Sequence, residues 1–262
     1  PPAVTESTIG YYAWLGGRGL TSTIIASEVP PLCHPLGEDN KLIIAPGLLS
    51  GTTAAMSGRI SVGCKSPLTG GIKEANSGGQ PSQMLARLGI AAIVLEGLPK
   101  DDTLYKMVIN KDGVEIKSDN SLKMLGNYDT VDKIKSEYGE KVSCISIGQA
   151  GEMKMSAASV AFSDMEQRPT RHAGRGGVGA VMGAKGIKAI VLDDEGMKMR
   201  KPADPGKFKA ANKAFVEGLR DGTLPRAAFL GYLVQDYIFL IHFSRAWALA
   251  VTKAETVDEM RL

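Results

Sequence analysis

The sequence predicts an α+β domain over residues 1–196, followed by a short helical extension over residues 197–262. Short apolar runs of strand length alternate with helix-like segments as far as residue 192, a pattern typical of mixed helix and sheet folds. A Lys-Asp-Gly turn at 111–113 separates two alternating segments and predicts a hairpin. After "DDEG" (193–196) the sequence becomes helix-like. We place a boundary near 196–203 and expect the extension to be the incomplete start of a next domain.

In the first half of the domain, glycine and proline mark the ends of the predicted elements. The loop "GGRGL" (16–20) leads into an apolar-periodic run that predicts a helix up to residue 28. Pro81 suits the first position of a second helix, and Gly89 suits its end. The predicted strands cover 41–47, 59–65 and 91–97, the second helix covers 81–90, and the polar glycine-rich stretch 66–79 is expected to be a loop.

The second half begins with the hairpin and continues the alternation of strands and helices. Asp204 is expected to cap the helix of the extension, and Gly222 to end it. The predicted elements are the hairpin 104–117, a helix over 128–138, strands over 141–148, 154–162 and 188–192, a helix opened by the glycine stretch 174–186, and the helix 204–222 of the extension.

The composition is that of a globular protein. The 262 residues are 44% apolar, and 31 basic and 28 acidic residues give a net charge of +3. No block of like charge suggests a nucleic-acid partner. Cys33, Cys64 and Cys144 show no CxxC spacing, which argues against disulfides and favours a reduced, cytoplasmic protein in which they are small apolar side chains. Three scattered cysteines cannot supply the four thiolates of an iron–sulfur cluster, so we expect none in the isolated chain.

The apolar stretch 227–251 raises the question of a membrane span. Asp236 and Arg245 interrupt it, and a charge in mid-span costs roughly 2.5–3.5 kcal/mol on insertion scales. We therefore expect no membrane segment, and interpret the stretch as a helix that packs on a partner surface.

Three glycine loops precede predicted helices, at 16–19, 76–79 and 174–177. Each places free backbone N–H groups at the positive end of a helix, and the first and third also contain an arginine. This arrangement binds anions. The alternative is that the glycines only permit tight turns and close helix packing, and for any single loop this alternative is at least as good.

We compare the sequence of the third loop with two nucleotide-binding motifs. Gly174, Gly176 and Gly179 match GxGxxG, which would suggest a nicotinamide-dependent dehydrogenase. That fingerprint requires a strand directly before it, and residues 163–173 are polar and contain a proline. A P-loop is excluded because no GxxxxGK[ST] occurs. Of the three histidines only His172, within the glycine stretch, is of functional interest.

Taken in order, four motifs resemble the N-terminal domain of the aldehyde ferredoxin oxidoreductase family of tungsten- or molybdenum-pterin enzymes. The resemblance extends over residues 10–195. The motifs are "LGGRGL" (15–20), "HPLGEDNKLIIAPGLLSG" (34–51), "SGRISVGCKSPLTGGIKEANSGG" (57–79) and "RHAGRGGVGAVMGAKGIKAI" (171–190).

The resemblance implies an internally duplicated α+β fold that carries a tungsto- or molybdo-bispterin, with magnesium joining the phosphates of the two pterins. Arg59 matches the arginine that links the pterin to a [4Fe–4S] cluster. Asn76 and Ala173 match residues whose backbone carbonyls bind the magnesium ion. The residues implied to bind the cofactor are Gly17, Arg18, Gly19, Arg59, Asn76, Ser77, Gly78, Gly79, Ala173, Gly174, Arg175 and Gly176.

The chain departs from the family where the resemblance ends. The cysteine set that holds the [4Fe–4S] cluster and the DxxGL pterin motifs are not found in it, and the tail beyond Gly222 no longer follows the family pattern. The complete enzyme would oxidise an aldehyde to a carboxylic acid with ferredoxin as electron acceptor, and we assign no catalytic residue in this chain. The alternative is a non-catalytic scaffold that holds the pterin, or another phosphate ligand, for a partner chain or in a homodimer.

Two further expectations concern arginines. Arg59, Asn76 and the loop 173–177 should converge on one concave surface, because a ligand with two phosphates needs donors from several segments. Arg200 is expected to lie beyond the domain, in a charged region without a role in the site.

Overall fold

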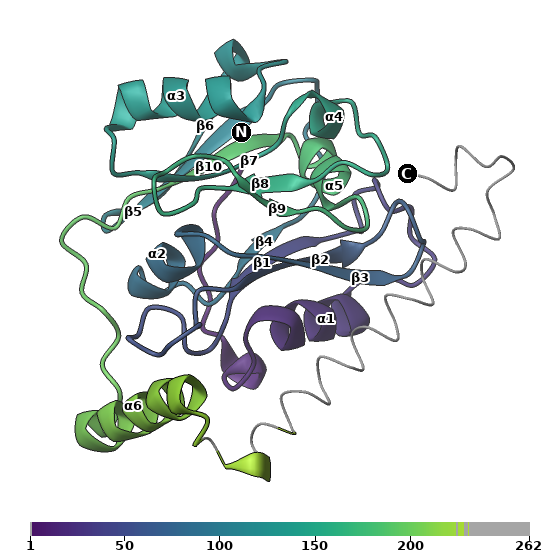
Figure 1. The fold of residues 1–262 in the computed structure, drawn as a ribbon. Helices are drawn as coiled ribbons and strands as arrows, with labels where there is room; N and C mark the ends of the chain where they lie inside the picture. The colour runs from purple at the N-terminus through teal and green to yellow at the C-terminus, as the bar shows by residue number, and fades with distance from the viewer. Residues whose placement is uncertain (1, 224, 228–229, 231–262) are drawn as a thin grey trace, which may run out of the picture. The chain divides into compact units, whose positions relative to one another are not determined.

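The computed structural model describes residues 2–223, 225–227 and 230. The chain falls into two compact units, Pro1–Lys201 and Pro202–Leu262. The first unit contains two β-sheets with helices on their faces (Figure 1). The predicted α+β fold class is therefore confirmed.

The first sheet has four antiparallel strands in the order β3-β2-β1-β4. Its strands are β1 (Leu42–Pro46), β2 (Ile60–Lys65), β3 (Ile72–Ser77) and β4 (Ile93–Leu95). Helix α1 (Gly17–Glu28) covers one face, where Leu20 and Ile24 pack on Ile43 and Ala45. Leu42 and Ile44 alternate to the opposite face and enter the main core.

The expected loop at 66–79 is wrong over its second half, because β3 occupies 72–77. This strand lies at the edge of the sheet and pairs with β2 alone, with Asn76 opposite Ser61. Of its six side chains only Ala75 and Ser77 are buried. An edge strand with so little buried surface lacks the apolar alternation that identifies a strand.

The second sheet has six strands in the order β6-β5-β10-β7-β8-β9. They are β5 (Tyr105–Asn110), β6 (Gly113–Ser118), β7 (Ser143–Ser146), β8 (Val160–Phe162), β9 (Arg171–Ala173) and β10 (Ile187–Leu192). The predicted hairpin is confirmed, since β5 and β6 are antiparallel and Asn110 pairs with Gly113 across the turn. Helix α3 (Asn127–Tyr138) packs on one face of the sheet through Val131 and Ile134.

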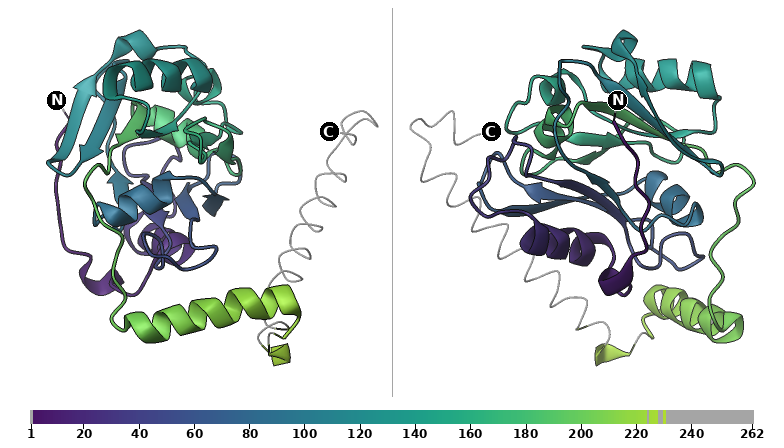
Figure 2. Two further views of the ribbon diagram at one scale, coloured as in Figure 1. Left: turned by 60° about the vertical axis from the view of Figure 1, so that its left-hand side comes forward. Right: turned by 180° about the vertical axis from the view of Figure 1, so that it is seen from behind.

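The main core lies between the two sheets. Helices α2 (Pro81–Arg87) and α5 (Val178–Ala184) contribute to it, with Leu85 and Val181 fully buried. Seen from two further directions, the sheets stack as central layers between α1 and α3 (Figure 2). Three short elements complete the unit: η1 (Gly10–Tyr12), η2 (Asn120–Leu122) and α4 (Gln149–Glu152).

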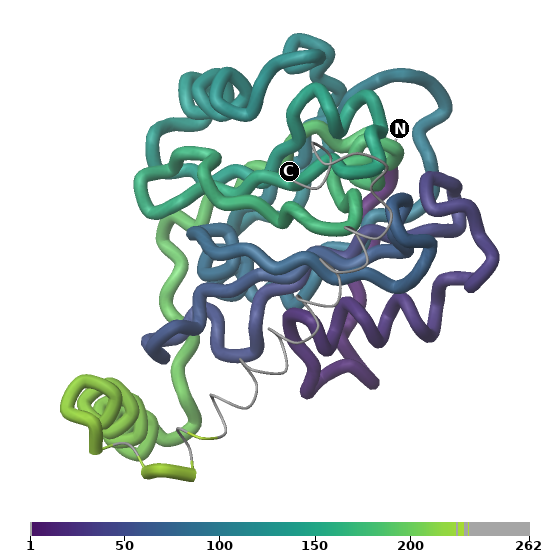
Figure 3. The backbone as a smooth tube through the Cα atoms, turned by 45° about the vertical axis from the view of Figure 1, so that its right-hand side comes forward, coloured from purple at the N-terminus to yellow at the C-terminus, as the bar shows by residue number. Residues whose placement is uncertain are grey.

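The two halves of the unit repeat one topology. The series α1-β1-β2-β3-α2-β4 has its counterpart in α3-β7-β8-β9-α5-β10, and the strand orders β3-β2-β1-β4 and β9-β8-β7-β10 match. The hairpin β5–β6 is an addition at the edge of the second half. The smooth backbone trace in Figure 3 allows both halves to be followed. The repeat makes β3 and β9 equivalent strands, each leading through a glycine loop into a helix.

Two strand predictions in the second half need correction. The strand expected over 154–162 is present only as β8, because residues 154–159 form turns and irregular structure, with Lys154 in the left-handed region at φ 57°. Strand β9 was expected to be polar loop. Arg171 and His172 are exposed and only Ala173 is buried, so this edge strand also lacks an apolar pattern.

The described part of the second unit is dominated by helix α6 (Pro205–Asp221). The Asp204 side chain accepts a hydrogen bond from the Lys207 backbone N–H at 2.9 Å, and Gly222 ends the helix at φ 72°. Both predicted caps are confirmed. The stretch 227–251 lies almost wholly outside the described residues. No helix in the described part of the chain is long and apolar enough to cross a membrane.

Candidate cofactor-binding site

The first glycine loop meets the first sheet at the N-terminus of α1. A Cβ atom on Gly16 would come within 2.7 Å of the Leu48 backbone nitrogen, and Gly17 has a φ of 50°, so both positions require glycine. Gly17 lies against Ser61 of β2. The helix begins without a side-chain cap or an acidic residue in its first turn. Its first N–H groups and positive dipole end are therefore available to an anion, beside the exposed Arg18 and Gly19.

Arg59 directly precedes β2, and its backbone is held from two sides. Its carbonyl oxygen accepts hydrogen bonds from Gly47 N–H at 3.1 Å and from the Ser82 hydroxyl at 2.7 Å. Ser82 also contacts the Ser50 hydroxyl at 2.8 Å, and both serines are completely buried. The Arg59 side chain is exposed. A fixed backbone thus presents a solvent-facing guanidinium, and sequence reasoning missed the two serines because nothing local marks them.

The second loop follows from the end of β3. Asn76 pairs with Ser61 and donates from its side-chain amide to the Ser61 hydroxyl at 3.2 Å. Ser77 is buried, whereas a Cβ on Gly78 would meet no atom within 4 Å. Gly79, at φ 113°, packs against the Ser163 carbonyl at the end of β8.

The third loop crosses the face of β3 that points away from α1. Gly176 is buried, its carbonyl accepts a hydrogen bond from the Ser66 hydroxyl at 2.7 Å, and the stem of Lys73 lies directly against its Cα. Gly174 and Arg175 are exposed, and a Cβ on Gly174 would meet no atom within 4 Å. The open part of this loop is therefore its first half.

Strands β3 and β9 lie side by side and run in opposite directions (Figure 1). Gly176 touches Lys73 at one end, and Gly79 touches Ser163 beside the start of β9 at the other. Counting along both strands from these contacts puts Ala173 level with Asn76. The second and third loops therefore lie at opposite ends of the two neighbouring strands, and Gly17 and Arg59 reach the Asn76 end of β3 through β2.

Most glycines of the stretch 174–186 serve packing rather than an open site. A methyl group on Gly177, Gly179 or Gly183 would overlap the backbone carbonyl of Ser156, Ser159 or Gly151, respectively. Helix α5 therefore needs these glycines to approach the segment 151–159. For these positions the packing interpretation holds.

The GxGxxG match is not a dinucleotide site, although β9 does stand directly before Gly174. In a dinucleotide fold the strand after the helix lies parallel to the strand before it in one sheet. Here β10 pairs with β5 and β7, while β9 pairs only with β8 and antiparallel. The topology excludes the unit.

Charged groups near the site are few and specific. Arg18 Nε lies 3.1 Å from Glu74 Oε2. Arg200, expected beyond the domain, instead donates from its guanidinium to the Leu48 carbonyl at 3.0 Å and from its backbone N–H to the Gly51 carbonyl at 2.7 Å. It therefore supports the loop beside Gly16. A substitution at Arg200 cannot serve as the control for a substitution at Arg59.

The cysteines are free thiols with no part in the site. Burial raises the pKa of the Cys64 and Cys144 thiols to about 12. In the described part of the chain, no three His, Cys, Asp or Glu side chains gather closely enough to hold a metal ion. A magnesium ion here would have to rely on backbone carbonyl and ligand oxygens.

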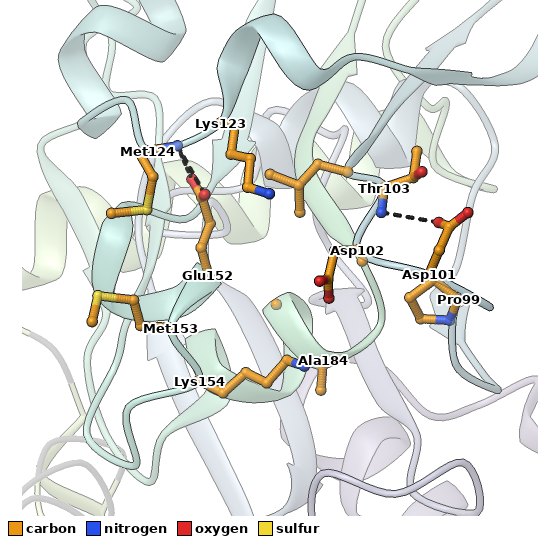
Figure 4. Close-up of a pocket in the computed structure, with 13 residues that line it drawn as sticks. Pro99, Asp101, Asp102, Thr103, Lys123, Met124, Glu152, Met153, Lys154 and Ala184 are labelled. Atoms are coloured by element: carbon orange, nitrogen blue, oxygen red, sulfur yellow. Dashed lines mark hydrogen bonds between the residues drawn. The ribbon is translucent and has the colours of Figure 1, made fainter.

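A separate pocket of about 270 Å³ lies between α4, the end of α5 and the segment before β5. Lys123 and Asp102 point into it, and Glu152 lies at its wall (Figure 4). Glu152 accepts from Met124 N–H at 2.8 Å and from the fully buried Lys188 ammonium at 2.5 Å. Desolvation lowers the pKa of Lys188, and the Glu152 carboxylate opposes this shift. None of the predicted site residues lines the pocket.

Comparison with known proteins decides the family. Residues 4–194 match the model of the aldehyde ferredoxin oxidoreductase N-terminal domain. The chain belongs to the aldehyde ferredoxin oxidoreductase family. It is 43% identical over 210 residues to the tungsten-containing aldehyde ferredoxin oxidoreductase of Pyrococcus horikoshii, covering 79% of this chain and 33% of that protein. The Pyrococcus furiosus enzyme of the same name is 42% identical over 219 residues, covering 81% of this chain and 35% of that protein.

A solved structure similar to this chain is the active-site complex BamBC of benzoyl coenzyme A reductase, in complex with 1,5-dienoyl-CoA. The match has a TM-score of 0.74 and 32% identity, and covers 83% of this chain and 32% of that chain. The chain thus spans about one third of the length of each of these proteins.

The end of the chain resembles a different family. Residues 207–262 match the model of the TENA/THI-4/PQQC family. The match to the oxidoreductase family ends at residue 194, and the first compact unit ends at Lys201. The two parts of the chain therefore resemble two different families.

Proposed function

We propose that the first unit forms the base of a tungsto- or molybdo-bispterin site, in an oxidoreductase that converts an aldehyde to a carboxylic acid and passes electrons to ferredoxin. The observation that carries the proposal is that β3 and β9, the outer strands of the two sheets, lie side by side. These equivalent strands from the two halves lie antiparallel, with Asn76 level with Ala173, and each leads into a glycine loop. A duplicated surface of this kind suits two similar ligands related by the same repeat.

Asn76 and Ala173 would hold the magnesium ion between the ligand phosphates through their backbone carbonyls. Magnesium prefers oxygen ligands, and few protein ligands suffice where phosphates supply the rest. Both residues lie on the outer strands of their sheets. The chemistry of these residues therefore fits the ion.

Arg59 and the N-terminus of α1 would supply positive charge to the ligand. A guanidinium presents a planar fork of donors, which suits phosphate and other bidentate acceptors better than an ammonium group. The bound metal would supply the redox chemistry. The protein's own part in this unit is to place the ligand and balance its charge.

The second candidate is a pterin-holding scaffold that acts with a partner chain. It is favoured by the tail, because residues 207–262 match a family different from that of the first unit. Only Cys33, Cys64 and Cys144 are present, and two of them are buried. The ligands of a [4Fe–4S] cluster would then come from another chain.

The test is cofactor retention. The chain is expressed with tungstate in cells that synthesise molybdopterin, and pterin, W, Mo and Mg are quantified after purification. We expect pterin and metal with the wild type and a clear loss with Arg59→Lys. Arg220→Lys, a matched change at an exposed arginine of α6, should leave both unchanged. Wild-type protein without pterin, or equal retention in both variants, would contradict the proposal.

A further inference from the structure

The guanidinium of Arg18 is held at the site by a carboxylate of the same sheet. Arg18 follows Gly17 in the first turn of α1, and Glu74 lies two residues before Asn76 on β3. Glu74 pairs with Gly63, on which Thr21 of α1 packs, so Glu74 and Asn76 share the face that α1 covers. Nε of Arg18 lies 3.1 Å from Oε2 of Glu74.

The contact uses one side of the arginine only. Among the hydrogen bonds of the described residues, those of Arg18 involve Nε and not the two terminal nitrogens, and its side chain is 70% exposed. A guanidinium oriented through Nε keeps both terminal N–H groups free for a second acceptor. Arg18 itself stands in the first turn of α1, whose N-terminus no side chain caps.

Among the residues that the structure describes, the Glu74 carboxylate has a hydrogen-bond partner for only one of its two oxygens. Its side chain is 9% exposed, and Oε1 is buried without a hydrogen-bond partner in the described part of the chain. An unpaired buried carboxylate oxygen is destabilising, and an apolar side chain at this place would avoid that cost. The ion pair with the exposed Arg18 offsets little of this destabilisation, because an ion pair with one solvated partner contributes weakly to folding stability. Stability therefore does not explain Glu74.

We propose that Glu74 is a positioning residue for anion binding: it orients Arg18 so that the free edge of the guanidinium and the N-terminus of α1 receive one phosphate group together. The ligand class is a phosphate-bearing molecule, which rests on the proposed cofactor function. The carboxylate acts through Arg18 and does not touch the phosphate. Charge alone would predict that Glu74 weakens anion binding, because a nearby negative charge repels an anion.

The test uses inorganic pyrophosphate as the probe, with calorimetry on the full chain. Glu74→Leu should weaken pyrophosphate binding about tenfold although it makes the chain more positive, and Glu74→Gln, which keeps an acceptor for Nε, should lose less. The melting temperature of Glu74→Leu should not fall. Glu115→Leu, the same charge change at an exposed residue of the hairpin, serves as the control and should leave binding unweakened.

A double-mutant cycle shows whether Glu74 acts through Arg18. In the Arg18→Ala background, Glu74→Leu should cause no further loss, because the residue it positions is already gone. Tighter or unchanged binding in Glu74→Leu, additive losses in the double variant, or no pyrophosphate binding by the wild type would each overturn the proposal. The cofactor function is judged separately by bound pterin. Pyrophosphate binding that follows the cycle in a chain that retains no pterin would refute that function and leave the role of Glu74 standing.

Discussion

The backbone of Gly183 lies so close to the Gly151 carbonyl that no side chain fits between them. Alanine normally stabilises a helix relative to glycine by about 1 kcal/mol. Here Gly183→Ala should instead destabilise the first unit by roughly 1–3 kcal/mol or more, because the methyl group meets backbone that cannot move aside. Gly174→Ala, in the same glycine stretch but with no atom near its Cβ, should stay within about 0.5 kcal/mol of the wild type. Urea unfolding measures both, and equal effects would refute the packing role.

Lys185 should make the stability of the first unit rise at alkaline pH. Its ammonium donates to the carbonyls of Gly37 at 3.1 Å and Glu38 at 3.2 Å. Burial lowers its pKa from 10.5 to about 8, against the weaker opposing effects of Cys33 and Glu96 and the other nearby acids. Between these two values the unfolded chain binds more protons than the folded one, so the contribution of Lys185 to stability increases with pH, by about 3 kcal/mol in total.

The measurement compares wild type with Lys185→Met by urea unfolding at several pH values from 7.5 to about 10.5. The difference in unfolding free energy between the two proteins should shift in favour of the wild type as pH rises. The other lysines contribute equally to the unfolding free energy of both proteins, so their contributions cancel in the difference. A difference that stays constant over this range would mean that Lys185 has an ordinary pKa in the folded chain.

Removal of the second unit should leave the first one folded. The first compact unit ends at Lys201, and the family match ends at residue 194. A chain cut after Lys201 should melt within about 2 °C of the full chain, a shift below that of 1 kcal/mol. A chain cut after Glu195 should melt lower, because it loses Arg200 and its hydrogen bonds to Leu48 and Gly51. Equal melting of both truncated chains would contradict the role given to Arg200.

The three thiols should differ sharply in reactivity. Thiolate is the reactive species, and burial raises the pKa of Cys64 and Cys144 to about 12. Cys33 is only partly buried. Titration with a thiol reagent at neutral pH should therefore modify one cysteine in the native chain and all three after unfolding. Rapid modification of two or more cysteines in the native chain would show that the core around β2 or β7 opens readily.

Much of the fold could be predicted from the sequence because its central elements carry strong local patterns. The buried strands β1 and β2 and the hairpin β5–β6 show apolar runs or alternation, and α6 shows both of its caps. Strands β3 and β9 could not be predicted. Both are edge strands with mostly polar side chains, and they become strands through pairing with partners about ten residues earlier in the chain.

The candidate site was only partly accessible from the sequence. Its glycine loops and Arg59 were recognisable as motifs, but the glycines serve two purposes that the motif alone does not separate. Gly174 and Gly78 face open space, while Gly177 and Gly183 face other backbone. Ser82 and Glu74 act through long-range contacts, to the Arg59 carbonyl and to Arg18. Such contacts are set by tertiary packing and leave no periodic signal.

The most direct test of the proposed cofactor site is a crystal structure of the chain with its pterin cofactor bound. We predict ligand density along β3 and β9, with a magnesium ion within coordination distance of the carbonyl oxygens of both Asn76 and Ala173. Cofactor density elsewhere, for example in the pocket beside Glu152 and Lys123, or a magnesium ion that touches neither carbonyl, would show that β3 and β9 do not form the cofactor site.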